Sequence, residues 1–93
     1  MNGRIKVVDS YELKGTEDNV FVIDGQAHLC RLEVFRSESE NVYTASIWRY
    51  DTGVWRALLE PHSVVRERNQ TEALAAATDL AAARLLDFVS QKG

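Results

Sequence analysis

The chain of 93 residues contains one cysteine, one proline and no long apolar stretch. A lone cysteine, Cys30, cannot form a disulfide within the chain, so we expect the fold to depend on a hydrophobic core. The longest uninterrupted apolar run is Ala73 to Ala77, far short of the roughly 20 residues that span a membrane. The first residues lack the apolar core of a secretory signal, and Asn2 stands where a myristoylation signal needs glycine. These absences favour a cytoplasmic protein with no membrane partner.

Positive charge is also scarce, because 11 Lys and Arg face 14 Asp and Glu for a net charge of -3. This balance disfavours binding to duplex nucleic acid. The five glycines are scattered and form no phosphate-binding loop, and no serine lies in a Gly-x-Ser-x-Gly elbow. His28 and Cys30 could face the same way on a strand, but zinc needs three or four ligands. We therefore expect no metal, no cofactor and no catalytic residues, and a protein that is not an enzyme.

The patterns that are present indicate one α+β domain over residues 1–93. Strand-like segments fill the first two thirds of the chain, and a long helical segment fills the last third. Together they predict an antiparallel sheet of four to five strands that is packed on one face by the C-terminal helix. We expect strands over 4–13, 20–24, 27–37, 42–50 and 54–60, and a helix over 70–89.

The first expected strand has apolar residues at the odd positions Ile5, Val7, Tyr11 and Leu13, which is typical of a half-buried strand. Asp9 interrupts this apolar face. A carboxylate there would have a raised pKa or would need a partner such as an arginine. Alternatively, the strand leaves the sheet near Asp9, at a bulge or an edge.

Two hairpins are expected from turn residues. Asp24-Gly25 lies between apolar runs, and Asp51-Thr52-Gly53 resembles a three-residue loop with Gly53 in the left-handed conformation. The second loop would place Tyr50 opposite Val54, and Trp48 opposite Arg56. The core face would then hold Tyr43, Ala45, Ile47, Trp55, Ala57 and Leu59, and the other face Thr44, Ser46, Trp48, Tyr50, Arg56 and Leu58.

In the helical segment, Asn69 followed by Glu72 resembles a capping arrangement. The helix wheel places one apolar stripe against the sheet, consisting of Leu74, Ala77, Ala81, Leu85, Phe88 and Val89. A second flank is small or apolar where a solvated helix prefers charge. This candidate helix-flank interface comprises Ala73, Ala76, Leu80 and Ala83.

The most site-like feature is the expected meeting of aromatic and arginine side chains on the sheet face away from the helix. Aromatic rings stack on bases and guanidinium groups pair with phosphates, so such a face could bind single-stranded nucleic acid. It could equally be a cross-strand cation–π pair or the buried face of a dimer. The candidate interaction surface comprises Trp48, Tyr50, Arg56, Arg66 and Arg68.

A resemblance extends over residues 43–89, where the order is strand, Asp51-x-Gly53-x-Trp55-x-Ala57, a loop at Pro61, and Thr71-Glu72-Ala73-Leu74 opening an alanine-rich helix. This pattern resembles that of HicB-like antitoxins, which have a partial double-stranded-RNA-binding-type fold. The resemblance implies a partner toxin, dimerisation and DNA-linked autoregulation through an additional domain. Residues 69–83 contain no Lys or Arg, so direct binding of duplex RNA is not expected.

We therefore expect a non-enzymatic protein-interaction module that acts as a homodimer or binds another protein. Apolar surfaces that a monomer would expose at a cost motivate this hypothesis. Three alternatives stay open: single-stranded nucleic-acid binding, an antitoxin-like role, and a small-ligand or enzyme pocket between sheet and helix that involves Asp9 or His28.

Overall fold

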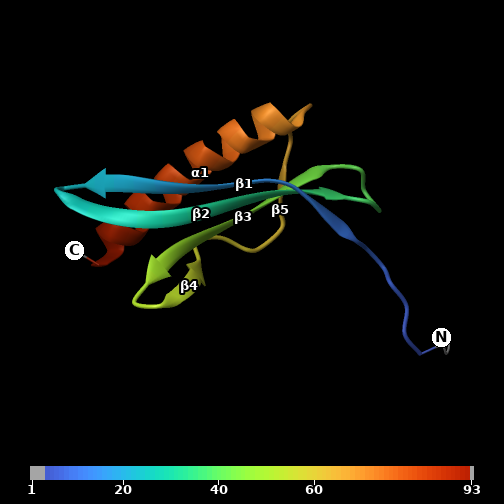
Figure 1. Cartoon of the computed structure of the whole chain (residues 1–93), viewed down its shortest axis with the longest axis horizontal. Helices are drawn as coiled ribbons and strands as arrows, with labels where there is room; N and C mark the ends of the chain where they lie inside the picture. The colour runs from blue at the N-terminus through green and yellow to red at the C-terminus, as the bar shows by residue number, and fades with distance from the viewer. Residues whose placement is uncertain (1–3, 93) are drawn as a thin grey trace.

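A computed structural model describes residues 4–92 as an antiparallel sheet with one helix against it (Figure 1). The sheet order is β1-β2-β3-β4, and β5 also pairs with β3. The expected α+β architecture is confirmed. The elements are β1 (Tyr11–Ile23), β2 (Gln26–Ser37), β3 (Tyr43–Asp51), β4 (Val54–Ala57), β5 (Ser63–Val65) and α1 (Gln70–Lys92).

β1 and β2 form one long hairpin across the turn Asp24-Gly25. Both turn residues have positive φ, 51° and 80°, as the type I′ turn of a two-residue hairpin requires. The expected separate strands 4–13 and 20–24 are wrong, because the polar residues 15–19 continue the strand. They can do so because β1 is an edge strand, whose polar side chains reach solvent. One irregularity, between Leu13 and Gly15, marks where the ladder shifts.

The hairpin between β3 and β4 has a two-residue turn, Thr52-Gly53, with φ values of 46° and 89°. Gly53 is left-handed as expected, but the expected three-residue loop is wrong. Tyr50 lies opposite Trp55, and Trp48 lies opposite Ala57. A shift of one residue moves every β4 side chain to the other face. Trp55 therefore leaves the core face, and Arg56 lies on the helix side opposite Arg49.

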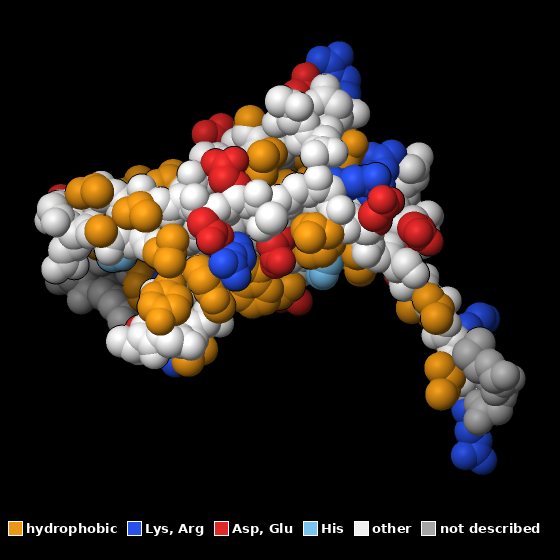
Figure 2. Space-filling view, in the orientation of Figure 1, with side chains coloured by type: hydrophobic (Ala, Val, Ile, Leu, Met, Phe, Trp, Pro, Cys, Tyr) orange, Lys and Arg blue, Asp and Glu red, His pale blue; other side chains and the backbone are white. Residues whose placement is uncertain are grey.

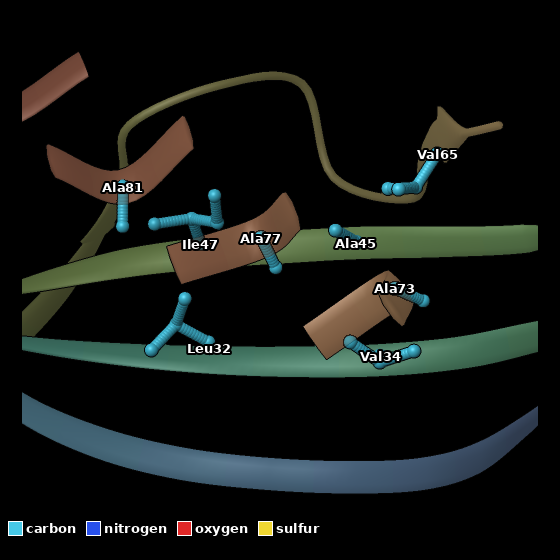
Figure 3. Close-up of a cluster of buried hydrophobic side chains, with 8 residues drawn as sticks. All are labelled: Leu32, Val34, Ala45, Ile47, Val65, Ala73, Ala77 and Ala81. Carbon is cyan, nitrogen blue, oxygen red and sulfur yellow. The ribbon is translucent and has the colours of Figure 1, made fainter. Parts of the chain in front are cut away.

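α1 covers one face of the sheet through small side chains (Figure 3). Alanine lets the helix backbone approach closely, so the larger side chains of β2 and β3 fill the space between the layers. The contact is fully buried and consists of Ala73, Ala77 and Ala81 from the helix against Leu32, Val34, Ala45, Ile47 and Val65 from the sheet. Cys30 lies in the same layer, and burial raises the pKa of its thiol although Arg49 nearby opposes the shift.

The start of α1 is capped as expected, since Asn69 Oδ1 accepts a hydrogen bond from Glu72 N at 2.9 Å. The expected helix-flank interface is not a free surface. Ala73 is fully buried in the core, and Ala76 and Leu80 pack partly against it. Only Ala83 of that set is exposed. The helix is rotated relative to the expected wheel, so that Ala73 replaces Leu74 at the centre of the buried stripe.

Residues 5–10 form an extended arm that leaves one end of the sheet (Figure 1). The arm is anchored at its base, where Ser10 O accepts a hydrogen bond from Glu38 N at 2.9 Å. The Asp9 carboxylate accepts hydrogen bonds from Ser37 Oγ and Ser39 N. Burial raises the pKa of Asp9, but hydrogen bonds from the serines outweigh it, so the pKa lies below its ordinary value. The partners of Asp9 are thus serines, and the strand leaves the sheet here.

The buried stripe of α1 can be tested with neighbouring leucines. Leu85→Asp places a carboxylate among fully buried side chains, and we expect it to lower the free energy of unfolding by several kcal/mol, about 3 or more. Leu86→Asp changes an exposed neighbour and should shift it by less than about 0.5 kcal/mol. Urea unfolding followed by circular dichroism measures both. Equal effects of the two variants would show that the helix faces are assigned wrongly.

Candidate functional site

The side of the sheet away from α1, here called the uncovered face, is not covered by any helix within residues 4–92. Apolar side chains spread over the strands of the molecule, with a few charged groups among them (Figure 2). Side chains alternate along strands, so the neighbours of the buried Leu32 and Ile47 point to this face. Its large exposed apolar residues are Tyr11, Leu13, Val20, Val22, Tyr50 and Val64.

Two indole rings organise the centre of the uncovered face. Trp48 Nε1 donates a hydrogen bond to Glu33 Oε1 at 2.7 Å, across the β2–β3 ladder. The Tyr50 ring meets Trp55 edge-on, with centroids 5.3 Å apart. The Arg31 guanidinium lies 4.4 Å from the Trp55 centroid. Such cation–π and edge-to-face contacts hold the rings in fixed positions.

Arg31 is also tied to a carboxylate of β1. Its Nε and Nη2 atoms donate to the two Asp18 oxygens at 2.8 and 3.0 Å, a two-pronged pair. The hydrogen bond from Arg31 lowers the pKa of Asp18, and the hydrogen bond to Asp18 raises that of Arg31. This guanidinium is therefore already engaged on both sides, by a carboxylate and by an indole ring.

A second aromatic group lies toward the arm and was missed by sequence reasoning. His62 stacks on Tyr11 with centroids 3.8 Å apart and lies 4.5 Å from the Phe35 centroid. Its Nδ1 lies 3.2 Å from Thr44 Oγ1, and its backbone N–H donates to Ser46 Oγ at 3.0 Å. These contacts explain why Thr44 and Ser46 are buried although they face away from α1. The only sequence signal was the turn Glu60-Pro61-His62-Ser63, which gives no hint of the partner strands.

The expected candidate interaction surface is only partly assembled. Trp48 and Tyr50 share the uncovered face as expected, and Trp55 joins them. Arg56 lies on the opposite side, where its Nε donates to Asp51 Oδ2 at 2.8 Å. Arg66 and Arg68 are exposed in the connection to α1, and Arg68 pairs with Glu72 at 3.3 Å.

Arg56 borders a cleft of about 430 Å³ between the β3–β4 hairpin and the end of α1. Arg49 and Arg84 also line it, and the Arg49 guanidinium lies 4.0 Å from the Phe88 centroid. The Arg49–Phe88 contact is a cation–π interaction that joins β3 to the C-terminal half of α1.

Neither a cluster of metal-ligating side chains nor a membrane-spanning helix occurs among residues 4–92. No three or more His, Cys, Asp and Glu side chains come together there in a way that could hold a metal ion. The single described helix is too polar to cross a bilayer. Asp9, a residue considered for a pocket between sheet and helix, lies at the base of the arm and binds serines.

Comparison with known proteins found no family model, no curated protein and no solved structure that matches the chain. The resemblance of residues 43–89 to HicB-like antitoxins stays a prediction.

The pair between Asp18 and Arg31 predicts a pH dependence. The folded pKa of Asp18 lies below its ordinary value, so the pair stabilises the fold above that ordinary value. This stabilisation is lost as the pH falls through the folded-state pKa. We expect the urea midpoint of the parent chain to fall more between about pH 6 and about pH 2 than that of Asp18→Asn. Asp79→Asn, on the exposed side of α1, is the control and should follow the parent chain.

Proposed function

We propose that the protein is a non-enzymatic protein-interaction module that acts as a homodimer. The observation that carries the proposal is the uncovered face, where aromatic and aliphatic side chains lie over a sheet that has its only described helix on the other side. Contiguous apolar patches of this kind typically mark a site of protein association.

The extent of the exposed surface supports a partner of substantial size. The chain has an accessible surface of 6414 Å². A compact monomer of 10.5 kDa exposes about 5400 Å². The excess of roughly 1000 Å² is comparable to the ~800 Å² that each partner buries in a standard interface. The radius of gyration of 15.1 Å likewise exceeds the value of about 12 Å for a compact domain of this length.

The charges of the uncovered face favour a second copy over nucleic acid. Asp18 and Glu33 outnumber Arg31 at its centre, and each already has a hydrogen-bond partner in its own chain. A second copy that approaches this side of the sheet therefore buries no unpaired charge, which would be costly. A nucleic-acid strand would instead need free guanidinium groups, but Arg56 lies on the helix side and Arg68 pairs with Glu72. We therefore favour self-association.

The proposal predicts a particle of twice 10.5 kDa at micromolar concentration, measured by light scattering after size-exclusion chromatography. Leu13→Asp introduces a charge on the uncovered face, and we expect it to raise the dimer dissociation constant at least about tenfold. Leu86→Asp is a matched control, because Leu13 is 50% exposed and Leu86 51% exposed, but Leu86 lies on the outer side of α1.

A parent chain that stays monomeric at these concentrations would contradict the proposal. So would equal weakening by Leu13→Asp and Leu86→Asp, because the dimer would then not depend on the uncovered face. Fluorescence anisotropy with labelled single-stranded RNA and DNA at low salt tests the competing class. Salt-sensitive binding there would favour nucleic acid over the dimer.

A further inference from the structure

The N-terminal arm continues a strand pattern for which residues 4–92 supply no partner strand. Ile5, Val7 and Val8 are 64%, 70% and 81% exposed. The odd apolar positions of the arm continue into Tyr11 and Leu13, which lie on the uncovered face. No residue from 4 to 10 has a positive φ, so the arm runs on from β1 without a left-handed turn. Half of an apolar strand face is thus paired in the sheet and half is not.

The hydrogen bond at the base of the arm shows which peptide groups are free. Ser10 O accepts from Glu38 N, so the peptide groups of even-numbered residues face β2 at this end of β1. Peptide groups alternate in direction along a strand, so those of odd-numbered residues face outward from the sheet. Val7, Tyr11 and Leu13 therefore present donors and acceptors along one continuous open edge.

This edge is the long one in the sheet. β1 has 13 residues and pairs only with β2, whereas the opposite edge is formed by β4 with four residues and β5 with three. A long unpaired edge invites another strand, and an extended apolar segment is the strand that such an edge accepts. The arm leads away from β1 (Figure 1), so it does not itself cover that edge.

We propose that a second copy of the chain pairs with both the arm and the open edge of β1. Each arm pairs antiparallel with the start of β1 in the other copy. This inference rests on the proposed homodimer and names its contact. The two-fold axis passes beside Ser10, and Val7 of each copy lies opposite Leu13 of the other. Such an interface is isologous, so both arms and both edges are satisfied by one symmetry operation. The two sheets join into one continuous sheet.

The side chains select this register. A shift that sets Val7 opposite Tyr11 would bring Asp9 against Asp9 of the other copy, and like charges directly opposite are destabilising. With Val7 opposite Leu13, Asp9 lies opposite Tyr11, and Ile5 lies opposite Gly15. The irregularity between Leu13 and Gly15 then ends the regular ladder at Ile5. The apolar arm residues come to lie beside Leu13 and Tyr11 on the uncovered face.

A cross-linking experiment tests the register. Residues directly opposite in a hydrogen-bonded pair have Cα atoms about 5.5 Å apart, which suits a disulfide. Val7 and Leu13 of one extended chain are about 20 Å apart, so a bond within the chain is excluded. We expect the double variant Val7→Cys/Leu13→Cys to form a covalent dimer under mild oxidation, seen on a non-reducing gel. The control Val8→Cys/Leu13→Cys should stay mostly unlinked, since residue 8 points to the other face.

Proline variants test the ladder without a new covalent bond. Val7→Pro removes an outward N–H from the arm, and with it the hydrogen bond that this N–H donates to the other copy. By symmetry, two such hydrogen bonds are lost per dimer. We expect its dimer dissociation constant to rise at least about tenfold. Val8→Pro, with the same residue change one position along, removes an N–H that faces away from the partner and should change the constant by less than about threefold. Both positions are outside the folded body, so neither variant should shift the urea midpoint of the monomer.

The outcomes separate the two proposals. A monomeric parent chain overturns the homodimer and this contact together. A dimeric parent chain with an unchanged dissociation constant in Val7→Pro, or with no cross-link in Val7→Cys/Leu13→Cys, overturns the arm exchange and leaves the homodimer standing. Loss of dimer in Val7→Pro alone, with the cross-link formed, supports both.

Discussion

The contact between α1 and the sheet is the constraint on which the remaining structure depends. Ala73, Ala77 and Ala81 let the helix lie close to β2 and β3, and the layer between them is fully buried. A chain of this length has one such helix in its described part, so one sheet face has a cover and the other has none. The helix buries the apolar side chains of the covered face. The aromatic groups of the uncovered face pack against one another and against the neighbouring strands.

That second side is ordered through contacts between side chains rather than through a second layer. The polar groups at the centre of the uncovered face pair with one another, through the Trp48–Glu33 hydrogen bond and the Asp18–Arg31 pair. His62, stacked on Tyr11, closes the end nearest the arm. The uncovered face is therefore preorganised, and an association there requires little rearrangement of side chains.

Much of the fold could be predicted from short local sequence patterns. The Asp24-Gly25 hairpin, the left-handed Gly53 and the Asn69 cap each depend on a few adjacent residues, and the structure has all three. The β3–β4 register cannot be predicted from adjacent residues, because Asp51-Thr52-Gly53 is compatible with a loop of two or three residues. A difference of one residue decided the faces of Trp55 and Arg56. Of the five candidate surface residues, the shared face of Trp48 and Tyr50 was thus predictable, and the arginine that lies beside them, Arg31, was not.

Other differences arise from contacts distant in sequence. Residues 15–19 read as a turn because they are polar, yet β2 holds them in a strand and Arg31 pairs with Asp18. His62 acquires its neighbours from β1, β2 and β3, none of which lies near it along the chain. Hydrophobic periodicity and turn residues do not show which residues far apart in sequence come into contact.

Burial of Cys30 gives the chain a built-in reporter of its own opening. Cys30 lies on β2, which is a central strand. It lies opposite Asn19 of β1 on one side and opposite Arg49 of β3 on the other. It is fully buried, and its raised pKa keeps it in the unreactive thiol form. Fraying of the arm leaves it covered, so a thiol reagent gains access only when α1 leaves the sheet beside Arg49 or when the strands separate. The rate of labelling at this one sulfur therefore reports opening of the layer between α1 and the sheet rather than fraying of the arm.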